Sequence, residues 1–204
     1  MALAWLYGSL GEQVWKLPAM PACTDAERQT LTAMLERGLG SPLTSSMGRL
    51  FDVVAFLTET AVRNSFDGQA AMSLEAAAET SGPVAALPFV IHQPATGPFL
   101  LDPLPALQSI VEQRRNGAHQ GRLARAFHTT IAQAVVDGCR WIRNNNGPDQ
   151  VVLSGGVFQN RLLTELVYSG LELAGFKVFS HRLAPPNDGG IALGQVAVAA
   201  HTVF

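Results

Sequence analysis

The stretch from Val151 to Leu163 constrains the fold more than any other part of the sequence. Its first three residues, Val151–Leu153, are apolar, mostly β-branched and flanked by polar residues, which predicts a short buried strand. Gly155 and Gly156 follow at once, and apolar residues then recur at helical spacing, at Leu162, Leu166 and Val167. A strand that turns through two glycines into a helix leaves backbone N–H groups open to an anion or a sugar edge. We expect Asn160 in the first turn of that helix, with its amide facing the ligand.

A second turn of the same kind follows about thirty residues later. Phe176–Phe179 predicts another short strand, Pro185–Pro186 a loop, and Asn187–Gly190 a polar entry into a last helix, Ile191–Ala200. In this strand–helix–strand–helix order, both glycine turns would open at the carboxyl ends of neighbouring parallel strands, where open α/β sheets bind ligands.

A third polar group lies on a helix that is predicted near the middle of the chain. Its apolar face consists of Met47, Leu50, Phe51, Val54 and Leu57. On the opposite face, Arg49 and Asp52 are spaced as an i,i+3 ion pair, which is an ordinary feature of a solvated helix. A nucleotide cleft lined by Gly48 and Asp52 is the alternative. Asp67 and Gly68 begin the next helix, where Asp67 could serve only as a cap.

The remaining elements are predicted from capping and periodicity. We expect an amino-terminal helix with Leu3, Leu6, Leu10 and Val14 on one face, a helix after the capping box Thr24–Glu27, edge strands at Val84–Ile91 and Phe99–Leu101 joined by residues 94–98, and helices at Leu104–Gln113 and Leu123–Ile142. His128, in the longest helix, is expected to be a packed histidine rather than a ligand.

Composition excludes several classes of function. The 204 residues are 48% apolar and 15% charged, with a net charge of −2, so neither nucleic acid nor an acidic membrane is an expected partner. No apolar run is long enough to span a membrane. Cys23 and Cys139 lie far apart and form no metal-binding pattern, which favours a reducing cytoplasm.

These motifs together resemble the carboxyl-terminal part of HypF, a family of hydrogenase-maturation carbamoyltransferases. The resemblance rests on Ser-Gly-Gly-Val-Phe-Gln-Asn-Arg-Leu-Leu at 154–163, Pro-Pro-Asn-Asp-Gly-Gly-Ile-Ala-Leu-Gly-Gln at 185–195, Thr-Ser-Ser-Met-Gly-Arg-Leu-Phe-Asp at 44–52 and Asp-Gly-Gln-Ala-Ala-Met at 67–72. The motifs occur in the family's order over nearly the whole chain. In one departure, Phe66-Asp67 stands where the family has tyrosine and glutamate, so the carboxylate is shorter.

The resemblance implies an α/β, helix-rich lobe of the actin-like, sugar-kinase-like ATPase fold that TsaD enzymes share. It also implies that residues 1–204 form the carboxyl-terminal part of one transferase domain, with no second domain. The family's histidine cluster and Asp-Gly-Thr-Gly segment precede this region and are absent from this sequence. We therefore expect a fragment that is inactive by itself.

The implied activity of the complete enzyme is carbamoyl transfer. Carbamoyl phosphate and ATP give carbamoyl-adenylate, and the transferase passes its carbamoyl group to the carboxyl-terminal cysteine of a HypE-type acceptor protein, for cyanide-ligand synthesis in [NiFe]-hydrogenase. The resemblance assigns Asp188 as catalytic residue and ligand of a divalent metal, Zn or Fe, that is shared with the upstream histidines. For nucleotide binding, as ATP, AMP or carbamoyl-adenylate, it assigns Gly48, Arg49, Asp52, Asp67, Gly68, Gly155, Gly156 and Asn160.

Two rival interpretations stay open. One is a TsaD-like tRNA threonylcarbamoyl transferase, which Phe158-Gln159 and the Asn187–Gly190 motif disfavour. The other is a lobe without catalysis that binds a partner. From the residues alone, capping of the last helix is a sufficient role for Asp188, and one carboxylate cannot hold a catalytic metal.

Overall fold

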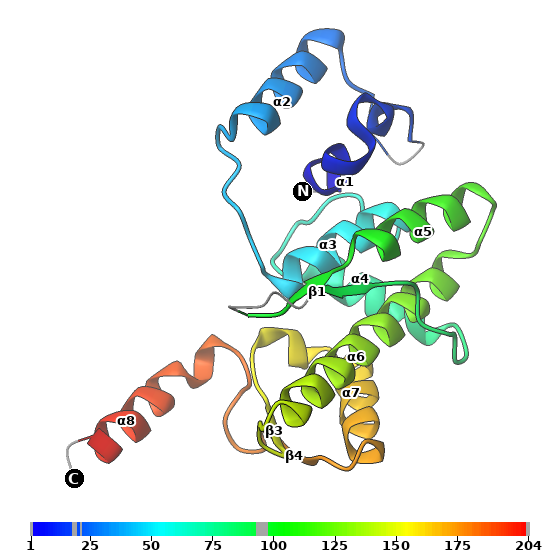
Figure 1. The fold of residues 1–204 in the computed structure, drawn as a ribbon. Coiled ribbons are helices and arrows are strands. Elements are labelled where there is room, and N and C mark those ends of the chain that lie inside the picture. The colour runs from blue at the N-terminus through cyan, green and yellow to red at the C-terminus, as the bar shows by residue number, and fades with distance from the viewer. Residues whose placement is uncertain (1, 18–19, 21, 93–97, 203–204) are drawn as a thin grey trace.

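In the computed structural model, which describes residues 2–17, 20, 22–92 and 98–202, the helices between residues 47 and 173 pack around the long helix α6 (Figure 1). The elements in chain order are α1 (Ala2–Leu10), η1 (Gly11–Lys16), α2 (Asp25–Arg37), α3 (Met47–Leu57), α4 (Gln69–Glu79), β1 (Val90–His92), β2 (Leu100–Asp102), α5 (Leu104–Arg115), α6 (Gln120–Asn144), β3 (Gln150–Leu153), η2 (Gly156–Gln159), α7 (Arg161–Leu173), β4 (Lys177–Ser180), η3 (Asp188–Gly190) and α8 (Ile191–Thr202). Within the described ranges, no helix is both long enough and apolar enough to cross a membrane.

Local signals set the boundaries of the amino-terminal helices. The predicted capping box is confirmed, because the Glu27 N–H donates to Thr24 Oγ1 at 3.2 Å and the Thr24 N–H donates to Glu27 Oε2 at 2.7 Å. The first helix is shorter than its apolar face predicts. It ends at Leu10, since Gly11 has a φ of 53°, and Val14 belongs to the 3-10 helix that follows.

The core is built on the buried face of α6, which contacts α3, α4, α5 and α7. Phe127 of α6 lies edge-on to Phe51 of α3, with ring centroids 5.0 Å apart, and both rings are almost fully buried. On α7, Gly170 permits the close approach of the two helices, because a Cβ there would lie 2.9 Å from Val136. The helix predicted at Leu123–Ile142 is confirmed, and it extends from Gln120 to Asn144.

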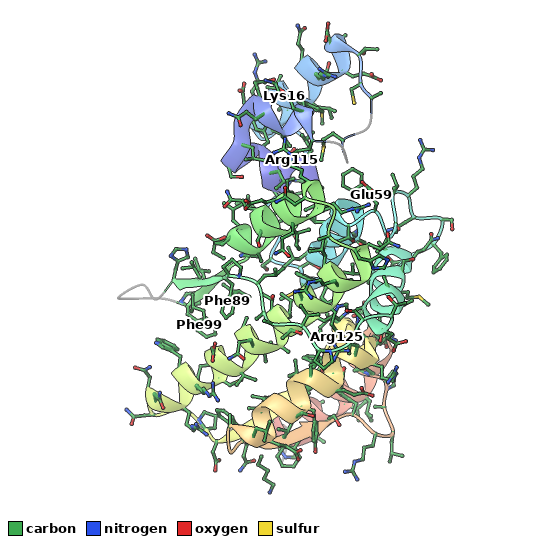
Figure 2. All side chains as sticks on the ribbon, turned by 90° about the vertical axis from the view of Figure 1, so that its right-hand side faces the viewer. Lys16, Glu59, Phe89, Phe99, Arg115 and Arg125 are labelled. Carbon is green, nitrogen blue, oxygen red and sulfur yellow. The ribbon has the colours of Figure 1, made fainter. Side chains whose placement is uncertain are left out.

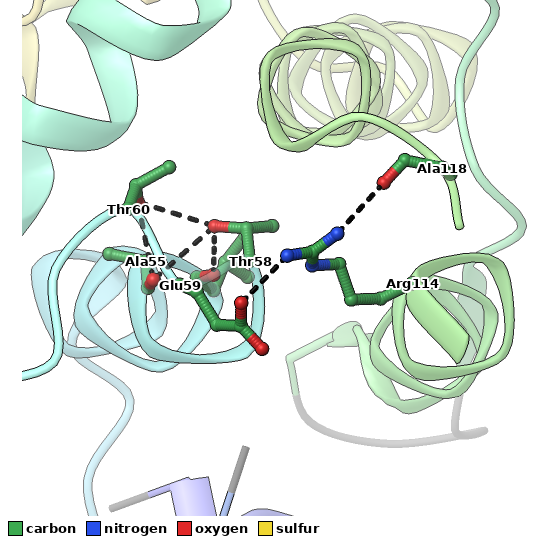
Figure 3. Close-up of polar contacts among 7 residues, drawn as sticks. Ala55, Thr58, Glu59, Thr60, Arg114 and Ala118 are labelled. Atoms are coloured by element: carbon green, nitrogen blue, oxygen red, sulfur yellow. Dashed lines mark hydrogen bonds and ion pairs between the residues drawn. The ribbon is translucent and has the colours of Figure 1, made fainter. Parts of the chain in front are cut away.

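The end of α3 is held against the turn between α5 and α6 (Figure 3). The buried Thr58 hydroxyl donates to the Val54 carbonyl at 2.8 Å. Arg114, near the end of α5, donates to the Glu59 carboxylate at 2.6 Å and to the Ala118 carbonyl at 3.3 Å. One guanidinium thus links three segments of the chain.

The strands β1 and β2 form an antiparallel ribbon that is shorter than the sequence predicts. Residues 84–89 are not a strand, because they run along α6, where the Leu87 N–H donates to Thr130 Oγ1 at 2.7 Å instead of to a neighbouring strand. The ring of Phe99, labelled in Figure 2, lies 5.4 Å from that of Trp141 on α6. Of the predicted connecting loop 94–98, residues 94–97 lie outside the described residues.

The strands β3 and β4 form the predicted parallel pair, with Val152 opposite Phe179 and Leu153 opposite Ser180. The expected burial of β3 is wrong, since Leu153 is buried but Val152 is 68% exposed. The reason is that the core lies against only one face of this two-stranded sheet. The last helix, α8, projects away from the rest of the chain in Figure 1, and all its residues are exposed.

Candidate functional site

The two glycine turns meet at the carboxyl ends of β3 and β4, as the sequence predicts. The Gly155 N–H donates to the Pro186 carbonyl at 2.7 Å, which joins the loop after β3 to the loop after β4. Gly155 has a φ of 106° and a ψ of 154°, a conformation that a residue with a Cβ rarely adopts. A Cβ on Gly156 would face Asn187 at 3.8 Å. The edge of the sheet therefore carries two polar loops that hold each other in place.

The first turn does not open directly onto a helix, which corrects the expected geometry. The 3-10 helix η2 separates Gly155 from α7, and Asn160 is the N-cap of α7 rather than a residue of its first turn. Two of the first amides of α7 are also occupied. The Leu162 N–H donates to Glu75 Oε1 at 3.1 Å, and the Leu163 N–H donates to Asn160 Oδ1 at 2.8 Å. An anion at this edge would meet the loops and not the amino terminus of α7.

Asn160 connects the turn to the core through His128. The His128 Nδ1 lies 2.8 Å from the Ala124 carbonyl, which can only accept, so Nδ1 carries the proton. Nε2 then accepts from the Asn160 Nδ2 at 3.0 Å, while Asn160 Oδ1 accepts from the Leu163 N–H. Burial lowers the pKa of His128, which is fully buried, and the network fits its neutral form. His128 is thus the packed histidine that the sequence predicts.

In the second turn, Asn187 rather than Asp188 provides the capping side chain. Asn187 Oδ1 accepts from the Gly189 N–H at 3.1 Å, and Asp188 is exposed. The carboxylate is therefore available to a ligand. Among the described residues, however, no three His, Cys, Asp or Glu side chains are grouped so that they could hold a metal ion. These residues do not fit a metal centre by themselves, because Asp188 supplies a single carboxylate.

The polar residues of α3 line a different hollow of the surface. Arg49 donates to Asp52 at 3.3 Å, which confirms the expected ion pair. Both side chains line a cavity of about 320 Å³, whose other walls come mainly from the amino-terminal helices and from residues 61–64. Trp15 and Leu31 are among its apolar lining residues. The cavity offers a charged rim and an apolar wall to a small molecule.

The predicted nucleotide residues therefore fall into three groups. Gly155, Gly156 and Asn160 belong to the segment after β3, Arg49 and Asp52 line the cavity, and the remaining residues, Gly48, Asp67 and Gly68, lie at the amino ends of α3 and α4. Gly68 is the N-cap of α4, with a φ of 80°, so Asp67 is not its cap. None of the described residues that line the cavity comes from 154–190. Nucleotide binding by all eight residues stays a prediction.

Sequence reasoning missed one polar pair at the edge of the sheet. His181 Nε2 lies 3.0 Å from Ser154 Oγ. Each residue directly follows a strand, and the register pairs the two preceding residues, Leu153 and Ser180. The signal was present in the sequence, because a serine and a histidine that end adjacent parallel strands come together when the strands are in register.

A family model described as "Carbamoyltransferase, Kae1-like Domain, second subdomain" matches residues 1–195. The carbamoyltransferase HypF of Rhodobacter capsulatus is 37% identical over 176 residues, which cover 86% of this chain and 22% of that protein. A carbamoyltransferase HypF homolog of Cupriavidus necator is 34% identical over 84% of this chain and 44% of its own length. This chain thus spans less than half the length of each of these curated relatives.

Solved structures show the same fold. A crystal structure of full-length HypF in a phosphate- and nucleotide-bound form superposes with a TM-score of 0.88 and 32% identity, over 97% of this chain and 30% of that one. The HypF structure of T. kodakarensis gives a TM-score of 0.72 and 25% identity, over 87% of this chain and 22% of that one. The prediction of a helix-rich α/β lobe is confirmed.

Proposed function

This chain belongs to the carbamoyltransferase HypF family, and from that premise we propose that it forms the lobe on which a carbamoyl-adenylate is held while its carbamoyl group is transferred. The proposed acceptor is the carboxyl-terminal cysteine of a HypE-type protein, and the proposed pathway is cyanide-ligand synthesis for [NiFe]-hydrogenase. The observation that supports this role best is the hydrogen bond between Gly155 and Pro186, which brings two polar glycine turns together at the carboxyl edge of parallel strands.

The chemistry of an acyl-adenylate assigns a task to each part of this edge. Its phosphate needs close approach to the backbone, which the absence of side chains at Gly155 and Gly156 permits. Its leaving group gains negative charge, which a divalent cation would neutralise when bound. Asp188 could contribute one carboxylate to such an ion, and the other ligands would come from residues outside this chain.

The proposed nucleotide contacts of α3 and α4 are Gly48, Arg49, Asp52, Asp67 and Gly68. Asp52 is already paired with Arg49, so a ribose hydroxyl would bind a carboxylate whose charge is partly compensated. Asn160 is buried, and its amide already donates to His128 and accepts from the Leu163 N–H. We therefore propose that Asn160 contributes to binding chiefly by fixing the turn that precedes it.

A chimera tests the proposal directly. Residues 1–195 of this chain would replace the matched segment of the Rhodobacter capsulatus carbamoyltransferase, and transfer from carbamoyl phosphate to a peptide that ends in cysteine would be measured. We expect transfer by the chimera and its loss in Asp188→Ala, with ATP–pyrophosphate exchange unchanged in both. A chimera that unfolds cooperatively at the temperature of the parent enzyme, yet transfers nothing, would contradict the proposal and favour a lobe without catalysis.

The isolated chain gives the complementary result. It should neither hydrolyse carbamoyl phosphate nor carbamoylate the peptide, since one exposed carboxylate is the only proposed metal ligand that it supplies. Detectable turnover by the pure chain would show that the catalytic residues are misplaced.

A further inference from the structure

The last helix, α8, is apolar on opposite sides and yet wholly exposed. At helical spacing Ile191 and Val198 lie on one side and Leu193 and Val196 on the other, and each of the four is between 54% and 66% exposed. Residues 191–202 include no Asp, Glu, Lys or Arg. A helix that is apolar all round belongs in an interior, because in water neither side of it is satisfied.

The preceding helix, α7, has the pattern that α8 lacks. In α7, Leu163 and Val167 are buried against the core, while Arg161 and Glu165 form an ion pair in solvent at 2.9 Å. In α8 every residue is exposed, and the helix projects away from the other elements (Figure 1). The part of the chain that the structure describes therefore does not cover α8.

The length and composition of α8 argue against two of the possible covers. Its 12 residues span about 18 Å, which is too short for the roughly 30 Å of a bilayer core. It also lacks the Lys and Arg residues of a helix that lies on a membrane surface. Pairing with the same helix of a second copy would bury a single stripe and leave the opposite side in water. A body of several elements is needed to cover both sides.

The family comparison indicates which body this is. The model that matches residues 1–195 describes them as a "second subdomain", so the same domain has a first subdomain in the family. The full-length HypF structure, which superposes with a TM-score of 0.88, is matched over only 30% of its chain. The relatives thus contain further folded elements to which an apolar helix can bind.

We propose that α8 is the helix by which this subdomain docks onto the first subdomain of the transferase, an assignment of partner that rests on the proposed function. Ile191 continues from η3 with helical dihedral angles, a φ of −59° and a ψ of −46°, so no loop separates α8 from Asp188. On the other side of Asp188, the Gly155 N–H holds the Pro186 carbonyl at 2.7 Å. One attachment is to this chain and the other is to the partner. Docking of α8 therefore holds the Asp188 carboxylate at the junction of the two subdomains.

Hydrogen exchange tests the docking in the isolated chain and in a chimera that carries residues 1–202, through the end of α8. We expect the amides of α8 to exchange at least about tenfold more slowly in the chimera, because a docked helix opens less often. Leu193→Asp places a charge in the proposed interface and should restore the fast exchange of the isolated chain. Leu100→Asp, which alters a leucine of β2 that is 59% exposed against 62% for Leu193, is the matched control and should leave the slow exchange unchanged. Neither substitution should change the urea midpoint of the isolated chain, where both leucines are in solvent.

The outcomes separate this proposal from the proposed function. Fast exchange of α8 in a chimera that transfers the carbamoyl group would overturn the docking and leave the function intact. Slow exchange that Leu193→Asp releases, in a chimera that transfers nothing, would support the docking and count against the function. Slow exchange already in the isolated chain would overturn the docking. Sedimentation would then assign α8 to the open face of its own sheet if the chain is a monomer, and to a second copy if it is a dimer.

Discussion

At the scale of single residues, Asn160 carries two structural tasks with one amide. Its Oδ1 caps α7 through the Leu163 N–H, and its Nδ2 donates to the buried His128 Nε2. Asn160→Ala removes the cap and leaves both buried partners unpaired, so we expect it to lower the free energy of unfolding by about 2 kcal/mol. Asn145→Ala, at the exposed carboxyl end of α6, is the control and should change it by less than about 0.5 kcal/mol. Urea unfolding followed by circular dichroism measures both values. Similar values for the two variants would show that the hydrogen bonds of Asn160 contribute little to the free energy of unfolding.

The same network predicts how stability depends on pH. Burial holds the pKa of His128 below its usual value in the folded chain, so between the folded and unfolded pKa values only the unfolded state binds the proton. Stability from this residue is complete above the unfolded pKa, about 6.5, and is lost as the pH falls toward the folded pKa. His128→Gln removes the titration. We expect a flatter profile of unfolding free energy between about pH 7 and pH 5 in this variant than in the wild type. Parallel profiles would assign the acid sensitivity to other groups.

At the scale of elements, α7 and α8 show how differently two apolar helices contribute to the free energy of unfolding. Val167 of α7 is fully buried, whereas Val196 of α8 is 66% exposed. Val167→Ala should therefore cost about 1.5–3 kcal/mol of unfolding free energy, and the chemically identical Val196→Ala should change it by no more than about 0.5 kcal/mol. Thermal and urea unfolding of the two variants provide the measurement. A large loss for Val196→Ala would mean that α8 packs against the chain in solution.

The elements that the sequence predicts best are those with local signals. The capping box at Thr24 and the long helix at Leu123–Ile142 depend on residues within a few positions of one another, and both are confirmed. The extent of β1 was not predictable in this way. Residues 84–89 have strand composition, but Leu87 finds its hydrogen-bond partner in Thr130, 43 residues away. Tertiary contact overrides propensity there.

At the scale of the whole molecule, the same distinction separates what could be predicted of the site from what could not. Two polar glycine turns at the ends of parallel strands follow from the order of elements, and the structure joins them. The fate of individual side chains does not follow, because it depends on distant partners. Asn160 meets His128 across 32 residues, and Ser154 meets His181 across 27. Composition likewise gave no sign that α8 and the open face of β3 would be exposed.

The exposure of the glycine turns leads to a prediction for nucleotide binding by the isolated chain. The two turns meet at an open edge of the sheet, whereas sites for small molecules remove most of the ligand's surface from water. We therefore expect AMP to bind with a Kd of about a millimolar or weaker, as measured by calorimetry.

In the active chimera, where the rest of the transferase is present, AMP should bind more tightly than to the isolated chain. Gly156→Ala should weaken it there by about 1–3 kcal/mol, because a Cβ at this position blocks access to the backbone. Asp52→Asn distinguishes the turns from the cavity that Arg49 lines. Micromolar binding by the isolated chain that Gly156→Ala leaves unchanged and Asp52→Asn abolishes would place the nucleotide in that cavity and contradict the role of the glycine turns.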